Sequence, residues 1–203
     1  MTLFYTNLDR SKIDVRRIHK MGRNAVDSNA VFIDDLFVPD KDRIGDEGQG
    51  FEYILDSLNP ERVLVAAEAI GLGRDALGRA AAYAKERVVF GRPIGQNQGI
   101  QHPLAECWVQ LEVAYWMTMR AAWMYYSGQS CGAEANTAKF LAGRAAFDIA
   151  TRGVLTHGGM GYAREYQVER LFHEAILTRI APVTEQLIMS LIAERVLGQP
   201  KSY

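Results

Sequence analysis

The stretch of sequence that decides the fold runs from Ser57 to Gln98 and reads SLNPERVLVAAEAIGLGRDALGRAAAYAKERVVFGRPIGQNQ. Its apolar residues recur with nearly helical periodicity, and small residues occupy most of the positions between them. Asn59 is a favourable N-cap and Pro60 suits the first helical position, so we expect a long helix to begin there. Small residues on several faces indicate a helix buried inside a bundle. The helix is expected to end at three helix-breaking residues, Gly91, Pro93 and Gly95.

The region before this helix has a different pattern. Residues 12–15 and 29–33 form short β-branched or alternating runs, separated by turn-forming clusters. We therefore expect a few antiparallel strands, which are too few to bury a two-sheet core alone. Residues 1–44 are predicted to be the remnant of a β domain, and residues 45–203 to form a separate helical bundle.

The region after the long helix continues the helical pattern. Glycine-containing breaks separate four further periodic segments, at about residues 102–127, 134–154, 166–177 and 184–197, and a short helix is expected before Asn59. Long helices joined by short breaks predict a mainly α fold, with an up-down four-helix-bundle-like domain.

Composition narrows the class of protein. The chain of 203 residues is 48% hydrophobic and 23% charged, which is typical of a soluble globular protein. A net charge of −1 argues against nucleic acid as a partner. Cys107 and Cys131 form no disulfide framework and no metal-ligand spacing, so no metal is assigned. Because no apolar run approaches about 20 residues and no targeting segment is visible, we expect no membrane partner. The expected location is the cytoplasm, or the mitochondrial matrix in a eukaryote.

Glu61, followed by Arg62, has two interpretations. A carboxylate in the first turn of a helix is favoured by the helix dipole, and position alone favours this simpler interpretation. The alternative is a general base, because a carboxylate in an apolar, water-poor pocket has a raised pKa and can remove an activated proton.

Two loops are rich in groups that bind anions. Around the breakers at residues 91–95 the chain gathers cations and amides, as an anion site requires, although a solvated loop explains them equally well. These are Arg87, Arg92, Gln96, Asn97, Gln98, Gln101 and His102, with Phe90 offering an aromatic face. Residues 157–162, HGGMGY, expose backbone N–H groups or simply stop a helix. The aromatic and Met residues at positions 108–126 are by default core residues, but they exceed what one helix face can bury, and the surplus indicates a subunit interface.

These two loops carry a resemblance. The run ERVVFGRPI at residues 86–94, then Gln98, then HGGMGY at 157–162 resembles the C-terminal helical domain of acyl-CoA dehydrogenases. Two motifs in this order are more specific than either alone, and the resemblance covers essentially the whole chain. Residues 1–44 resemble the last strands of the middle β domain of that family.

The resemblance implies a flavin enzyme that oxidises the Cα–Cβ bond of an acyl-CoA to a trans-2-enoyl-CoA. A Glu takes the α-proton while N5 of FAD takes the β-hydride. It also implies an electron-transferring flavoprotein as electron acceptor and a homodimer or homotetramer. Matched positions imply FAD binding across a subunit interface by Arg87, Phe90 and Gln98, contacts to the adenosine and diphosphate part by Gly158 and Gly159, and a late FAD-contacting pair, Thr184 and Gln186.

The position of the base distinguishes branches of the family. Many members carry the Glu before the last helix, where this chain has Pro182. A second branch, similar to isovaleryl-CoA and long-chain enzymes, carries it at the position of Glu61. The resemblance therefore assigns the base to Glu61 and places Arg62 near the CoA portion. Leu155 stands where relatives often have a Gln that contacts the flavin.

Two other functions remain open at this point. The N-terminal helical domain and most of the β domain of that family are missing from this sequence. The chain is thus also consistent with a non-catalytic assembly domain or partner subunit. An acyl-CoA oxidase, which passes electrons to oxygen, would share the same residues.

Overall fold

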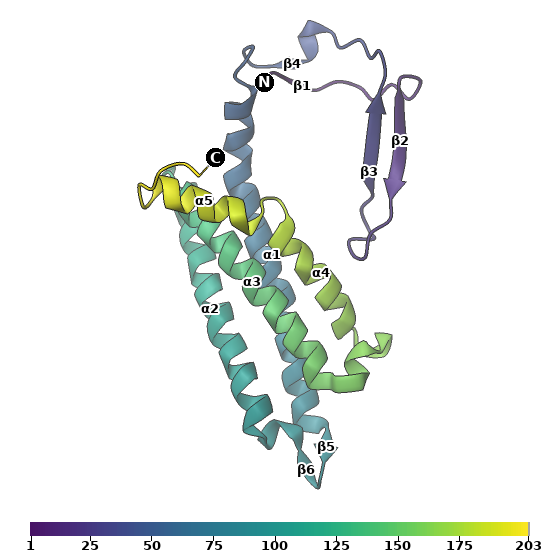
Figure 1. The fold of residues 1–203 in the computed structure, drawn as a ribbon, viewed down its shortest axis with the longest axis vertical. Helices are drawn as coiled ribbons and strands as arrows, with labels where there is room; N and C mark the ends of the chain where they lie inside the picture. Colours follow the sequence, from purple (N-terminus) through teal and green to yellow (C-terminus); the bar gives the residue numbers. More distant parts are fainter. Residues whose placement is uncertain (203) are drawn as a thin grey trace. The chain divides into compact units, whose positions relative to one another are not determined.

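The computed structural model describes residues 1–202, and the chain divides into two compact units, Met1–Leu58 and a second unit that begins at Asn59. The first unit contains the expected antiparallel strands (Figure 1). Strand β1 (Leu3–Phe4) pairs with β4 (Arg43–Ile44), and β2 (Ile13–Ile18) pairs with β3 (Ser28–Ile33); a 3-10 turn, η1, covers Asp40–Asp42. Ile13 is the one buried residue in these four strands, so the two pairs bury little apolar surface within this unit.

Helix α1 (Gly50–Glu86) corrects the expected helix start. It runs without interruption through Pro60, so Asn59 is not an N-cap and no separate short helix precedes it. An interior proline removes one helical hydrogen bond, and here the rest of the helix is sufficient to continue past that loss. The boundary between the two units falls directly before Asn59. Because Glu61 lies in the interior of α1, the helix-dipole explanation for its position no longer applies.

A small hairpin follows α1 where an irregular loop was expected. Strand β5 (Val88–Val89) pairs with β6 (Arg92–Pro93) across Phe90 and Gly91, whose φ angles are 53° and 79°. Two successive residues at positive φ make the kind of tight turn that matches the twist of a hairpin. A phenylalanine at positive φ is uncommon, which is why the pattern did not predict this turn.

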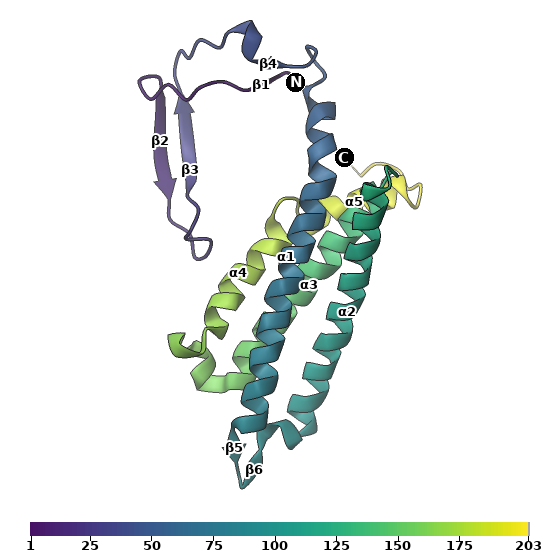
Figure 2. The same cartoon turned by 180° about the vertical axis from the view of Figure 1, so that it is seen from behind.

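The second unit is a helical bundle, which confirms the predicted mainly α fold. After η2 (Ile94–Gln96) come α2 (Gln98–Tyr126), α3 (Gly132–His157), the 3-10 turns η3 (Gly158–Tyr162) and η4 (Arg164–Tyr166), α4 (Val168–Ile180) and α5 (Glu185–Arg195). The part of α1 after residue 59, then α2, α3 and α4 alternate in direction, and the short α5 crosses one end of the bundle (Figures 1 and 2).

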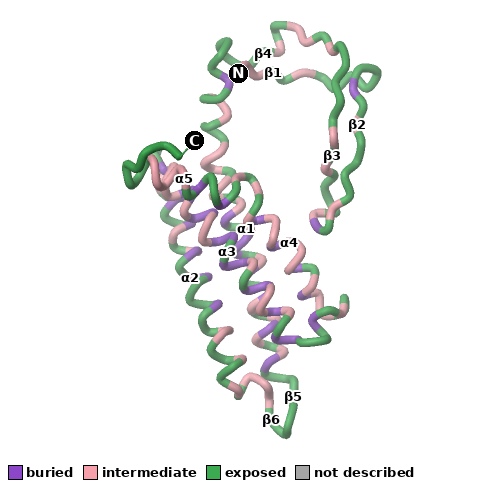
Figure 3. The backbone as a smooth tube through the Cα atoms, viewed as in Figure 1, coloured by how far each residue is buried: buried purple, intermediate pink, exposed green. Residues whose placement is uncertain are grey.

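Alanine dominates the core of the bundle. Figure 3 shows the buried positions on the inward sides of the helices, and small residues there let backbones approach closely. At Gly143 in α3, a Cβ atom would lie 2.6 Å from the carbonyl oxygen of Thr178 in α4. Fully or almost fully buried alanines include Ala66, Ala69, Ala76, Ala114, Ala121, Ala138, Ala142, Ala146 and Ala150.

Residues 168–195 are long and apolar enough to cross a membrane by length and composition, with a mean hydropathy of 1.3 in the best window. The structure divides this stretch into α4 and α5. An ion pair between Arg179 and Glu185 spans the break, with Nε and Oε1 separated by 2.7 Å. This break and its charges argue against a continuous membrane-spanning helix.

Candidate functional site

The predicted site residues lie in two groups at opposite ends of the bundle. The base end comprises Glu61, Arg62, Thr184 and Gln186, and the hairpin end comprises Arg87, Phe90, Gln98, Gly158 and Gly159. Glu61 and Glu86 are 25 residues apart along α1, which at 1.5 Å per residue corresponds to about 38 Å. The structure therefore does not bring the two groups together within one chain.

At the base end, Arg62 has an incompletely satisfied guanidinium. Its Nη1 donates to Oδ1 of Asn59 at 2.9 Å, whereas its Nε is buried and has no hydrogen-bond partner among the described residues. Burial lowers the pKa of Arg62, and the neighbouring Glu61 opposes that shift. Glu61 itself is exposed. The exposed carboxylate of Glu61 is thus next in sequence to a guanidinium that has one hydrogen-bond donor without a partner among the described residues.

A buried ionic network underlies the base end, and sequence reasoning missed it. Lys139 in α3 is only 1% exposed, and its Nζ donates to the carbonyl oxygens of Arg179 at 3.3 Å and Val183 at 2.5 Å. Glu185 accepts four hydrogen bonds from the guanidinium groups of Arg144 and Arg179, at 2.7–3.1 Å. The hydrogen bonds from Arg179 hold the pKa of Glu185 below its ordinary value. A lysine inside an apolar, alanine-rich segment was the signal available in the sequence.

Thr184 and Gln186 lie where α5 begins. Thr184 is the N-cap of α5, and its Oγ1 accepts a hydrogen bond from the backbone N–H of Leu187 at 3.4 Å. The hydroxyl hydrogen of Thr184 is still available to a ligand. Gln186 is exposed. Both side chains are therefore at the surface of the base end.

The hairpin end presents its predicted residues to solvent. Phe90 is fully exposed at the turn, and Arg87 and Gln98 are also exposed. The side chain of Arg92 donates instead to Oδ1 of Asn97 at 2.7 Å. A groove of about 370 Å³ lies beside the hairpin, between the end of α1 and the start of α2. Its lining comprises Ala81, Ala84, Lys85, Pro93, Gly95, Gln96, Gln101 and Leu104.

At the hairpin end, the glycine-containing turn η3 (Gly158–Tyr162) directly follows His157, which packs against α1. This imidazole is buried, its Nδ1 lies 2.7 Å from the carbonyl oxygen of Gly153, and its ring stacks on Tyr83 with centroids 4.2 Å apart. The stacking ties the loop to the end of α1. Added Cβ atoms at Gly158 and Gly159 would meet no heavy atom within 4 Å. The backbone of these two glycines is therefore open to a ligand.

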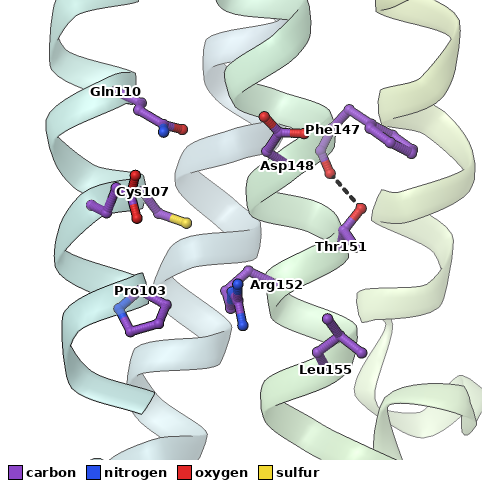
Figure 4. A pocket seen from close by; sticks show the side chains of 9 residues that line it. Pro103, Cys107, Gln110, Phe147, Asp148, Thr151, Arg152 and Leu155 are labelled. Carbon is purple, nitrogen blue, oxygen red and sulfur yellow. Dashed lines mark hydrogen bonds between the residues drawn. The ribbon is translucent and has the colours of Figure 1, made fainter. Parts of the chain in front are cut away.

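A second groove, of about 320 Å³, lies between α2 and α3 (Figure 4). It reaches Leu155, and the thiol of Cys107 borders it with a pKa that burial raises. Two of its charged residues, Glu106 and Asp148, are acidic and one, Arg152, is basic, so the groove shows no preference for an anion. The lining comprises Pro103, Glu106, Cys107, Gln110, Phe147, Asp148, Thr151, Arg152 and Leu155.

Comparison with known proteins identifies the family. Residues 48–197 match the family model described as acyl-CoA dehydrogenase, C-terminal domain. The chain belongs to the acyl-CoA dehydrogenase family. Members of this family are oxidoreductases, and the match covers the long helix, both loops and the buried network.

Three relatives illustrate the extent of the similarity. Acyl-CoA dehydrogenase FadE12 of Mycobacterium tuberculosis is 41% identical over 175 residues, which cover 85% of this chain and 45% of FadE12. Butyryl-CoA dehydrogenase from Megasphaera elsdenii is 30% identical with a TM-score of 0.91, over 97% of this chain and 51% of that one. An FAD complex of PigA is 28% identical with a TM-score of 0.92, over 97% and 51%. The chain thus spans about half the length of the acyl-CoA dehydrogenases that it matches.

Proposed function

We propose that this chain is the C-terminal part of an FAD-dependent acyl-CoA dehydrogenase and that Glu61 removes the α-proton of the acyl-CoA. The proposed product is a trans-2-enoyl-CoA. The observation that carries the proposal is the pairing, at the base end, of an exposed Glu61 with Arg62, whose buried Nε has no partner among the described residues.

Glu185, a second carboxylate at the base end, is unsuited to act as a base. Glu185 is engaged in four hydrogen bonds with two arginines, which hold it ionised and leave its oxygens little freedom to accept a proton. Residues 178–184 read TRIAPVT and contain no carboxylate. Glu61, by contrast, is exposed and has the freedom to approach a substrate.

The hairpin end has the chemistry expected of a site for the outer part of FAD. A guanidinium at Arg87 and open glycine N–H groups suit a diphosphate, and the exposed ring of Phe90 suits stacking on an aromatic group. FAD, when bound, supplies a hydride acceptor. Because this end lies about 38 Å along α1 from Glu61, these residues would hold the FAD that serves the Glu61 of a second subunit.

An oligomer through α2 is part of the same proposal. One side of α2 exposes large apolar side chains that a monomer would leave in water, including Trp108, Val109, Val113, Trp116 and Trp123. A homodimer or homotetramer would cover them. We further propose an electron-transferring flavoprotein as electron acceptor and the cytoplasm as location.

The test compares Glu61→Gln with a matched control, Glu52→Gln, an exposed glutamate of the same helix. The full-length enzyme, loaded with FAD, is mixed anaerobically with acyl-CoA and the visible flavin band is followed. Removing a general base costs about 10²–10⁴ in rate, so Glu61→Gln is expected to keep its FAD but lose flavin reduction, while Glu52→Gln reduces normally.

The outcomes separate the alternatives. Flavin reduction at the normal rate in Glu61→Gln would contradict the assignment of the base. A wild-type protein whose flavin is never reduced by any acyl-CoA would favour an assembly subunit. Hydrogen peroxide formed in proportion to substrate in air would identify an oxidase.

A further inference from the structure

Lys139 is the most deeply buried charged residue among those described. The residue is 1% exposed and lies in the first half of α3, among alanines that pack against neighbouring helices. Lysine is almost never fully buried unless its charge is compensated, because an ammonium loses its hydration. An apolar side chain of similar volume would often serve stability at least as well. The presence of a charge here therefore needs a reason other than packing.

The bonds of Lys139 converge on one short segment. Its ammonium donates to the carbonyl oxygen of Arg179, in the last turn of α4, and to that of Val183, in the connection that leads into α5. Among the described residues, no other side chain of α3 forms a hydrogen bond with residues 181–184. The ammonium of Lys139 thus binds the turn between α4 and α5 at two points, one before it at Arg179 and one within it at Val183.

The part of α3 that contains Lys139 packs along the part of α1 that contains Glu61. A Cβ atom at Gly132 would lie 4.0 Å from Nδ2 of Asn59, and one at Gly73 would lie 3.5 Å from Cα of Ala146. Burial lowers the pKa of Lys139, Glu185 opposes that shift, and the positive charges of Arg62 and Arg179 add to it. Arg62 therefore lies within electrostatic reach of the ammonium, from α1, one residue after Glu61. Glu185, the carboxylate whose charge opposes this shift, is already shared by two arginines.

We propose that Lys139 is a positioning residue for proton removal: its ammonium clamps the α4–α5 turn, residues 181–184, against the part of α1 that carries Glu61 and Arg62. This inference rests on the proposed function of Glu61. It adds that the α4–α5 turn is held through its main-chain carbonyls by a lysine, whatever side chains the turn carries.

The test uses Lys139→Met in the full-length, FAD-loaded enzyme, with Lys41→Met, an exposed lysine, as control. Methionine keeps an unbranched apolar stem and removes the ammonium. We expect kcat for acyl-CoA oxidation to fall at least tenfold, the isotope effect with α-deuterated substrate to rise, and the FAD content and urea midpoint to stay at or above wild-type values. Lys41→Met should change none of these quantities.

A second variant keeps the test decisive if Lys139→Met does not fold. Lys139→Gln retains N–H donors for the carbonyl of Val183 without the charge, and is expected to keep a larger share of kcat than Lys139→Met. An unchanged kcat in either variant would overturn the proposal. So would a loss of kcat matched by an equal loss of FAD or a lowered urea midpoint, because that pattern indicates a purely structural lysine.

The same experiments distinguish this proposal from the function on which it rests. If Glu61→Gln still reduces its flavin, the proposed base is wrong whatever Lys139 does. If Glu61→Gln is inactive while Lys139→Met behaves like wild type, the base stands and the clamp is wrong.

Discussion

The two ends of the bundle are built in opposite ways. At the base end, two charged side chains are buried and hydrogen-bonded. Lys139 donates two hydrogen bonds to main-chain carbonyls, and Glu185 accepts four from two arginines. At the hairpin end, Arg87, Phe90 and Gln98 stand in solvent without comparable partners. The buried network of one end is paired within the chain, whereas the predicted residues of the other end are left to solvent.

This difference suggests that the base end positions a reacting group and that the hairpin end binds a ligand and a second subunit. A site that positions a proton-removing group benefits from rigid support, because small displacements of a catalytic group are costly in rate. A surface that meets a large ligand and a second subunit needs side chains that are accessible before assembly. The following predictions test this contrast, from the largest expected effect to the smallest.

The largest effect is expected from mixing two inactive variants. Glu61→Gln damages the base end and Arg87→Gln damages the hairpin end, and each homo-oligomer of the full-length enzyme should be nearly inactive. If each FAD site combines the base end of one subunit with the hairpin end of another, random co-assembly restores roughly a quarter of the intact sites. Anaerobic flavin reduction by acyl-CoA in the mixed oligomer measures this. No recovery would show that both ends serve the same site within one subunit.

Two glycine substitutions should differ strongly in stability. At Gly143 a Cβ atom would lie 2.6 Å from the backbone oxygen of Thr178, whereas at Gly159 it would meet nothing within 4 Å. Gly143→Ala is expected to lower the free energy of unfolding by about 1–3 kcal/mol through overpacking. Gly159→Ala should leave it within about 0.5 kcal/mol of wild type, as is usual for surface changes. Urea denaturation compares the two, and equal losses would contradict the contrast.

The ion pairs of Glu185 should make stability depend on pH. Because hydrogen bonds from Arg179 hold the pKa of Glu185 below its ordinary value of 4.5, its contribution is complete above pH 4.5 and is lost as pH falls through the lower, folded-state value. Glu185→Gln should lower the free energy of unfolding by about 2 kcal/mol at pH 7, the scale of a hydrogen bond to a charged group. The gap between variant and wild type should narrow below pH 4.5. A gap that stays constant with pH would refute this role for the carboxylate.

Phe90 should show a ligand effect without a stability effect. Since its side chain is fully exposed, Phe90→Ala is expected to leave the urea midpoint unchanged. Loss of a stacking partner for FAD should weaken cofactor affinity by about tenfold, the scale of 1.4 kcal/mol. Equilibrium titration of the apoenzyme with FAD provides the measurement, and Phe37→Ala, which changes a largely exposed residue of the first unit, is the control. Unchanged affinity in Phe90→Ala would remove this residue from the proposed site.

The sequence predicted the bundle well because periodicity and glycine breaks report local structure. It predicted the wrong start for α1, since Asn59 and Pro60 together satisfy the local rules for a helix beginning while the helix passes through both. The β5–β6 turn was missed because a Phe at positive φ breaks the usual preference. In both cases the surrounding structure overrode a local rule.

The candidate site was only partly predictable for a different reason. The residues of both loops, and Glu61, could be located from motifs and their order. The network around Lys139 could not, because it joins three helices whose partners are separated by about 40 positions and depends on burial rather than on spacing. The separation of the two ends, in contrast, follows from the length of the helix between Glu61 and Glu86, which the sequence already predicted to be continuous.

The measurement that tests the central claim most directly is the anaerobic visible spectrum of the full-length, FAD-loaded enzyme during titration with a panel of saturated acyl-CoA thioesters. The account predicts that at least one thioester bleaches the flavin band and yields one trans-2-enoyl-CoA per flavin reduced. A flavin that stays oxidised with every member of the panel, in a protein that still binds FAD and oligomerises, would contradict it.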